Sequence, residues 1–493
     1  MATRGDLSQH STLFYQLAFG GLFLALVLSG AKSMMYGSTN DIKLLAVAAV
    51  GITAVLALDK WYWILLPVLQ TAGIEASGLP FSPFELGQIA VITMYFFRKG
   101  LRNSEERPIR ISGVVLASFP LVFWMFGIFC INPCGMYIFG SSMLGGRFYM
   151  QILLAWLTLL IASSWRFDER NCRVLFFCLL CGSVINIVNT VLSEATWQYV
   201  GEERAVAYEF IGFSTLFLLM FARYRIPEII SKFWRIAIVG ISIAFVLYSG
   251  KRIRAGHVVL APIIRVFLTG RDKVATIFCG LLAALFLSVF VMGDKANIYE
   301  VPNSVKRTLA MFVPYFKDDV RNTGLKDEFR VTMRAYATEQ IKQSPWVGLK
   351  GFAINRTELL MVKNSMFVTK EHYGQVVARN WHSTFHAYAA DFGLPALLFF
   401  VLFILMELRE MIKECKKCLP IAGTYSSTVM MYYSFLFILS CFTFYSFGHT
   451  ATTTQNSFLF ISMFIAVRNG VRRADSPKKA DQFLAATTQD APL

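Results

Sequence analysis

Two histidines and an arginine stand at the entrance to an apolar segment late in the chain. In the stretch ARNWHSTFHAYAADFGLP, residues 378–395, Arg379 precedes His382, and His386 follows four residues later. On a helix that begins here, residues four apart lie on the same face, so the two histidines would share it. A histidine can exchange a proton near neutral pH, and an arginine binds phosphate oxygens through two parallel hydrogen bonds. The stretch therefore favours a catalytic or anion-binding site.

Two other interpretations of the histidine pair stay open at this point. The histidines could be solvated residues at the end of an interfacial helix that is anchored by Trp381. A metal site would need a third ligand, and HSTFH lacks the glutamate of the HExxH zinc pattern. Upstream, Asp318 and Asp319 form a lone acidic pair rather than a metal-binding cluster. We therefore expect no metal.

A second group of basic residues interrupts the apolar sequence earlier in the chain. The turn SGKRIRAGH, residues 249–257, places Lys251, Arg252 and Arg254 between two apolar stretches. Charges beside membrane spans are costly unless they have a partner. The arginines could reach lipid phosphates at the membrane surface. We favour a binding site for a multiply charged anion, which Arg379 would complete.

The elements that must position these residues are membrane-spanning helices. Of the 493 residues, 56% are hydrophobic and only 16% are charged, which is typical of a multi-span membrane protein. The apolar runs predict an all-α fold with about 12 to 14 transmembrane helices. A formal net charge of +16 would also suit nucleic-acid binding. In a polytopic protein, however, such an excess lies in cytoplasmic loops beside anionic lipid, so we expect no nucleic acid.

Lysine and arginine residues in short loops predict the orientation. They are concentrated in residues 98–110, 166–173 and 223–235 and near the C-terminus, which places both termini in the cytoplasm. The chain then divides into an N-terminal transmembrane bundle (1–292), a hydrophilic loop on the outer face (293–385), C-terminal transmembrane helices (386–470) and a tail that we expect to be disordered (471–493).

The hydrophilic loop contains helical sequence of its own. Apolar side chains recur every four residues along 327–343, at Phe329, Met333, Ala337 and Ile341. This repeat predicts a helix with one apolar face. The following stretch, SPWVGLKGFA, should end the helix at Pro345 and turn at Gly348 and Gly351.

With these residues in place, the chain resembles the superfamily of O-antigen ligases and O-antigen polymerases, which are bacterial envelope glycosyltransferases. The family signature is a periplasmic loop that runs from an arginine to PllGvG, followed by a helix that begins HNxxL and continues through an acidic residue to GLPG. Here Arg330, SPWVGLKGF and HSTFHAYAADFGLPALL occur in that order, and YSGKRIRAG approximates a tgSRg pattern in an earlier helix. The resemblance covers roughly residues 240–410, and the N-terminal half matches only in hydropathy.

The resemblance implies roles for individual residues. His382 occupies the reactive position, and Asp391 and Arg330 occupy further positions of the expected pocket. The donor pyrophosphate would be bound by basic residues: Lys251, Arg252, Arg254 and Arg379. His386 is a further pocket candidate, although the family has an apolar residue there. The sequence also departs from the family pattern where Ser383 replaces asparagine and Ala396 replaces the last glycine.

The activity that the resemblance implies is transfer of a glycan from undecaprenyl pyrophosphate to an acceptor hydroxyl. The reaction would be an inverting displacement, without metal or cofactor, on the periplasmic side of the bacterial inner membrane. The acceptor is lipid A core in a ligase and a second lipid-linked repeat unit in a polymerase. We favour the ligase, because there is one long loop with a single histidine signature late in the chain. A rival of another class is a transporter or flippase of lipid-linked oligosaccharide, which should show inverted repeats and interrupted helices.

Overall fold

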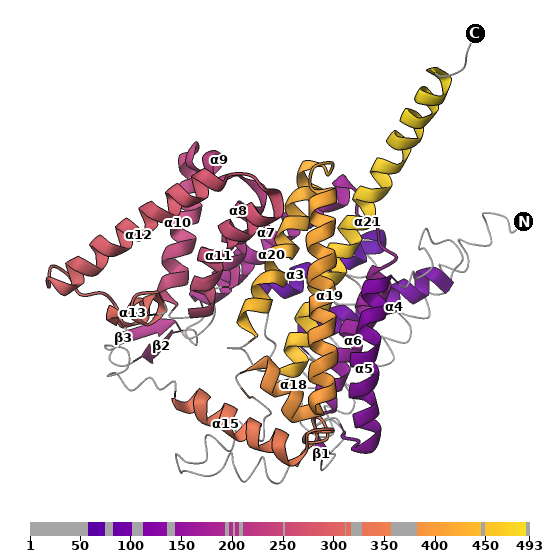
Figure 1. The fold of residues 1–493 in the computed structure, drawn as a ribbon, viewed down its shortest axis with the longest axis horizontal. Coiled ribbons are helices and arrows are strands. Elements are labelled where there is room, and N and C mark those ends of the chain that lie inside the picture. Colours follow the sequence, from indigo (N-terminus) through magenta and orange to yellow (C-terminus); the bar gives the residue numbers. More distant parts are fainter. Residues whose placement is uncertain are drawn as a thin grey trace, which may run out of the picture.

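The computed structural model of the chain describes most of the sequence, in the ranges 58–73, 82–100, 112–135, 143–192, 197–200, 203–206, 211–249, 252–310, 312–316, 328–355, 381, 383–444 and 449–489. These parts are predominantly helical, as the sequence predicts. The longer helices stand side by side in a bundle, and Figure 1 shows one of them, α21, projecting beyond it.

The helices fall into three groups along the chain. The first group is η1 (Asp59–Ile64), α3 (Leu65–Ala72), α4 (Pro83–Gly100), α5 (Gly113–Ile131), α6 (Gly146–Ala162), α7 (Glu169–Leu192) and α8 (Ile211–Arg223). The second is α9 (Ile226–Ile230), α10 (Phe233–Tyr248), α11 (Arg252–Thr269), α12 (Lys273–Lys295) and α13 (Asn303–Leu309). The third is α15 (Glu328–Gln343), α18 (Thr384–Phe392), α19 (Leu394–Cys418), α20 (Thr424–Thr443) and α21 (Thr450–Gln489).

Within the part of the chain that the structure describes, three helical segments are long and apolar enough to cross a membrane: Glu169–Thr190, Lys273–Lys295 and Thr424–Thr443. Four shorter apolar helices accompany them: Val115–Ile131, Gly146–Ala162, Ile211–Arg223 and Phe233–Tyr248. Large apolar side chains of α12 are exposed, among them Leu285 (63%) and Phe286 (72%). An apolar helix with so little protein cover is what lipid would surround.

The core lies where α20 and α21 pack against α6, α7 and α8. Buried aromatic side chains fill it, including Phe217 on α8, Tyr433 on α20 and Phe458 on α21. Because apolar residues surround α20 on nearly all sides, the helix is buried rather than amphipathic. The bundle is therefore held together by helices from both halves of the chain.

Short strands add to the predicted all-α fold. β2 (Trp197–Val200) and β3 (Glu203–Val206) form an antiparallel hairpin, and β1 (Met143–Leu144) pairs with β4 (Ile354–Asn355). Two to four residues are too few to give a strand pattern that sequence alone would detect. The β1–β4 pair ties the segment before α6 to the long hydrophilic loop.

The C-terminal segment differs from the prediction. The sequence predicts disorder over 471–493, whereas α21 continues to Gln489. The segment is polar, which suggested disorder, but it is also rich in alanine, lysine and glutamine, which favour helix.

Candidate functional site

The site is built around α15, the helix predicted in the hydrophilic loop. Figure 1 shows α15 lying across the lower end of the bundle, next to α18. Met333 and Ala337 are buried in a cluster with Trp381 and two alanines of α18, and Ile341 packs at its edge. The predicted apolar face is thereby confirmed for these three positions, while the side chain of Phe329 lies outside the described residues.

The turn that follows α15, residues 344–353, docks on the C-terminal end of α18. The backbone N–H of Leu349 donates to Ala390 O at 2.7 Å, and that of Gly351 donates to Asp391 O at 2.7 Å. In return the N–H of Leu394 donates to Pro345 O at 2.7 Å. Three carbonyl groups from two distant parts of the chain are satisfied in this way.

Glycine is required on both sides of this contact. Gly348 and Gly351 have φ of 56° and 86°, as the predicted turns imply, and Gly393 has φ of 84°. These values lie in the region that only glycine adopts without strain. A Cβ on Gly393 would also collide with the backbone of Trp346. The PWVGLKG and FGLP motifs are therefore two halves of one structural unit.

Asp391, a predicted pocket residue, holds that unit together through its side chain. The residue is fully buried, at 0% exposure. Its Oδ1 accepts from Trp381 Nε1 at 2.9 Å, and its Oδ2 accepts from Thr450 Oγ1 at 2.9 Å. A carboxylate can be buried when both oxygens are hydrogen-bonded. Asp391 is thus a positioning residue that fixes Trp381, the residue before His382.

His386 lies half-buried on the first turn of α18. Its Nδ1 is 2.9 Å from Ser383 Oγ. Burial, and then the positive charge of Arg334 on α15, lower the pKa of His386. The imidazole is therefore neutral at pH 7.

The sequence prediction missed Arg334. It lies four residues after Arg330, a spacing that puts the two positions on one face of α15. That spacing could have revealed it, because the same face carries the residues that contact α18. The structure describes Arg330 only as part of the α15 backbone.

The other predicted site residues are placed to differing extents. His382, Arg379 and Lys251 lie outside the described residues, and Arg252 is described only as the first residue of α11. Arg254 lies on the first turn of α11, where its positive charge interacts electrostatically with the side chain of Tyr432 on α20. Helix α11 packs on α8, α10, α13 and α20, whereas α18 packs on α15 and α21, and both contact α19.

The basic turn before α11 is shorter than predicted. Helix α11 begins at residue 252, so only residues 249–251 separate it from α10. The 16 residues of α10 span about 24 Å, less than the roughly 30 Å of a hydrocarbon core. Helix α13 covers the end of α10, where Thr308 Oγ1 donates to Leu247 O at 2.9 Å. It brings Lys306 and Arg307 to the same region, which sequence reasoning did not single out.

Behind α18, a layer of polar side chains crosses the otherwise apolar bundle. Tyr388 OH lies 2.5 Å from Thr454 Oγ1, and Gln455 Nε2 donates to Gln88 Oε1 at 2.9 Å. Glu85, which is 1% exposed, accepts from Arg147 Nε and NH2, both at 3.2 Å. Buried polar networks of this kind are costly unless satisfied, and they restrict the core to one arrangement.

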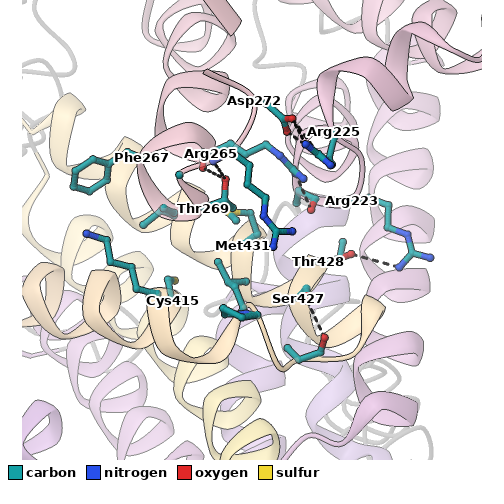
Figure 2. Close-up of a pocket in the computed structure, with 18 of the residues that line it drawn as sticks. Arg223, Arg225, Arg265, Phe267, Thr269, Asp272, Cys415, Ser427, Thr428 and Met431 are labelled. Carbon is teal, nitrogen blue, oxygen red and sulfur yellow. Dashed lines mark hydrogen bonds and ion pairs between the residues drawn. The ribbon is translucent and has the colours of Figure 1, made fainter. Parts of the chain in front are cut away.

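Within the described residues, no group of three or more His, Cys, Asp or Glu side chains could hold a metal ion. A cavity of about 590 Å³ lies elsewhere, at the C-terminal end of α19 (Figure 2). The 25 residues of α19 separate it from α18 by about 36 Å. Comparison of the chain with models of known protein families and with curated proteins finds no match.

Proposed function

We propose that the protein is a multi-pass membrane glycosyltransferase that resembles O-antigen ligases. It transfers a glycan from undecaprenyl pyrophosphate to an acceptor hydroxyl, in the ligase case on lipid A core, at the outer face of the bacterial inner membrane. About 12 to 14 helices cross the membrane in this proposal, and both termini are cytoplasmic. The described helices support such an orientation, since α9, in a predicted cytoplasmic loop, lies at the opposite end of the bundle from α15 and α18 (Figure 1).

The observation that carries the proposal is the docking of residues 344–353 and α15 on α18. The two motifs of the resemblance are about 40 residues apart in sequence, yet they interlock through backbone hydrogen bonds and glycines. A loop held this rigidly can position a reactive group, because catalysis depends on geometry fixed to a fraction of an ångström. Asp391 also fixes Trp381, which directly precedes His382 in the sequence.

The chemistry is a displacement at the anomeric carbon. His382 orients the acceptor hydroxyl or takes its proton as the glycosidic bond forms, and pyrophosphate on its lipid carrier leaves with the bonding electron pair. Arginines stabilise the charge that develops on the pyrophosphate. Arg252, Arg254, Arg379 and Lys251 are the residues proposed for this task. Arg334 on α15 adds positive charge beside α18, and Arg330 is a further residue proposed for the pocket.

The decisive experiment is transfer by the purified protein. The chain, in detergent, receives undecaprenyl-pyrophosphate-linked oligosaccharide and either lipid A core or more lipid-linked donor. His382→Ala should reduce transfer by about 10²- to 10⁴-fold, the usual contribution of general acid–base catalysis. Arg252→Lys should also be much weaker than wild type, because an ammonium lacks the two-point guanidinium contact.

His386→Ala is the matched control, since it removes a neighbouring histidine from the same helix end. This variant should lose less glycan-transfer activity than His382→Ala, because the His386 imidazole is already neutral and is hydrogen-bonded to Ser383. Near-normal transfer by His382→Ala would refute the assignment. A glycan ladder without a core-linked product would identify a polymerase. Movement of the donor across vesicles with no product would favour a flippase.

A further inference from the structure

The cavity at the C-terminal end of α19 is lined by an excess of positive charge. Its volume of about 590 Å³ lies in the range of small-molecule sites. Five basic side chains line it, from α8, α11, α19 and the loops beside α9 and α12, and one acidic side chain, that of Asp272. The basic residues are Arg223, Arg225, Arg265, Arg271 and Lys416. Figure 2 shows Arg225 next to Asp272 and Arg223 next to Thr428, each pair joined by dashed lines.

The single carboxylate neutralises only one of these cations. Arg225 contacts Asp272 through Nε at 3.0 and 3.1 Å and through NH2 at 2.5 Å. This hydrogen-bonded contact lowers the pKa of Asp272, which is therefore ionised and paired. Among the described residues, no ion pair joins the remaining four cations of the cavity to a carboxylate. Five basic side chains and one carboxylate thus leave the cavity with an excess of positive charge.

Arg265 is the least expected of the four, because it is buried. Its exposure is 9%, and it lies on the apolar helix α11. One guanidinium nitrogen donates to the carbonyls of Phe221 and Ala222 in the last turn of α8. Its Nε has no hydrogen-bond partner among the described residues. A buried charged group with an unsatisfied N–H donor destabilises the fold unless a ligand accepts that hydrogen bond.

The N-terminus of α20 does not supply the anion site, although its first turn lines the cavity. The carboxylate of Glu169 already accepts from the backbone N–H groups of Tyr425 and Ser426 at 2.7 and 3.0 Å. The side chains therefore provide the charge. Arg223 lies 4.4 Å above the ring of Tyr425 and donates to Thr428 Oγ1 at 3.5 Å. This contact holds its guanidinium at the rim of the cavity.

We infer that this cavity binds a phosphate-bearing ligand on the face opposite α18. Arginine forks match phosphate oxygens, and basic pockets between helices on a cytoplasmic face bind anionic headgroups. The apolar wall formed by Phe267, Leu419 and Met431 would accept the non-polar part of such a ligand. The phosphate belongs either to a lipid headgroup or to a water-soluble phosphorylated compound. This inference does not depend on the proposed glycan transfer.

The test uses the full chain in neutral detergent and phosphate-free buffer. Two probes distinguish the sources: inorganic pyrophosphate, and phosphatidylglycerol in mixed micelles with phosphatidylcholine as the neutral comparison. The variant Arg271→Gln/Lys416→Gln removes two cavity charges. The control Lys413→Gln/Lys417→Gln removes two exposed charges from the same end of α19 that do not line the cavity.

The cavity variant should weaken binding of the preferred probe by about tenfold or more, since hydrogen bonds to charged groups are strong. The control pair should bind within about threefold of wild type. Binding of pyrophosphate would identify a soluble ligand, and binding of phosphatidylglycerol alone a lipid headgroup. The inference is overturned if neither probe binds, or if the control pair weakens binding as much as the cavity variant. Because Arg271 and Lys416 are exposed, this comparison does not depend on a variant that fails to fold.

Discussion

The hydrogen bond between Asp391 and Trp381 predicts a measurable energetic coupling. Trp381→Phe removes the indole donor and leaves Asp391 Oδ1 with one partner fewer in a fully buried site. Asp391→Asn replaces a carboxyl acceptor by an amide, which weakens the contacts with Trp381 and Thr450. A hydrogen bond to a charged group contributes about 1.5–3 kcal/mol to stability. Leaving a buried donor or acceptor without its hydrogen-bond partner costs about 1–3 kcal/mol. Each single substitution should therefore destabilise the protein by about 2 kcal/mol.

The assay is a double-mutant cycle on the free energy of unfolding in mixed SDS micelles. The double variant should cost about 1–2 kcal/mol less than the sum of the single variants, because the shared bond is lost only once. Thr450→Val, which removes a partner of Asp391 but leaves Trp381 in place, should retain more glycan transfer than Trp381→Phe. Additivity of Trp381→Phe and Asp391→Asn within about 0.5 kcal/mol would refute the argument that this bond organises the site.

Three further predictions concern stability. Gly393→Ala should lower the melting temperature sharply, because its φ is 84° and the added Cβ would collide with the backbone of Trp346. Gly240→Ala is the control: a Cβ there on α10 meets no other atom, so the substitution should be neutral or stabilising. Burial lowers the pKa of His449 to about 4. The free energy of unfolding should therefore fall by about 3 kcal/mol as the pH is lowered from about 6.5 to 4, because the unfolded chain binds the proton more readily. Melting curves of His449→Gln should not show this pH-dependent loss of stability. Arg147→Gln should lower the melting temperature more than Glu85→Gln, because it leaves a buried carboxylate without its cation.

Much of the helical organisation follows from hydropathy and periodicity. The four-residue repeat at Met333, Ala337 and Ile341 predicts the buried face of α15, because a helix brings such residues into one stripe. The glycine turns follow equally well, because positive φ is largely restricted to glycine. Short β ladders and the helical C-terminal segment could not be predicted, because neither has an apolar pattern that distinguishes it from loop.

The site was harder to predict than the fold. Asp391 stands at the acidic position of the family signature, but no sequence pattern indicates that Trp381 and Thr450 donate to its two oxygens. The buried pair of Gln88 and Gln455 joins helices 367 residues apart, and no local pattern encodes such a partner. Arg334 was missed although its spacing from Arg330 was visible.

The way α18 is held has a consequence for biosynthesis. Besides the bond from Thr450, the N–H of Thr384 donates to Phe444 O at 2.7 Å, and the hydroxyls of Thr384 and Thr453 lie 3.4 Å apart. Every one of these partners follows α18 in the sequence by at least 50 residues. A ribosome must therefore deliver the start of α21 before α18 can reach its final position. Chains that terminate before residue 444 should therefore lack the contacts that hold α18 against the start of α21.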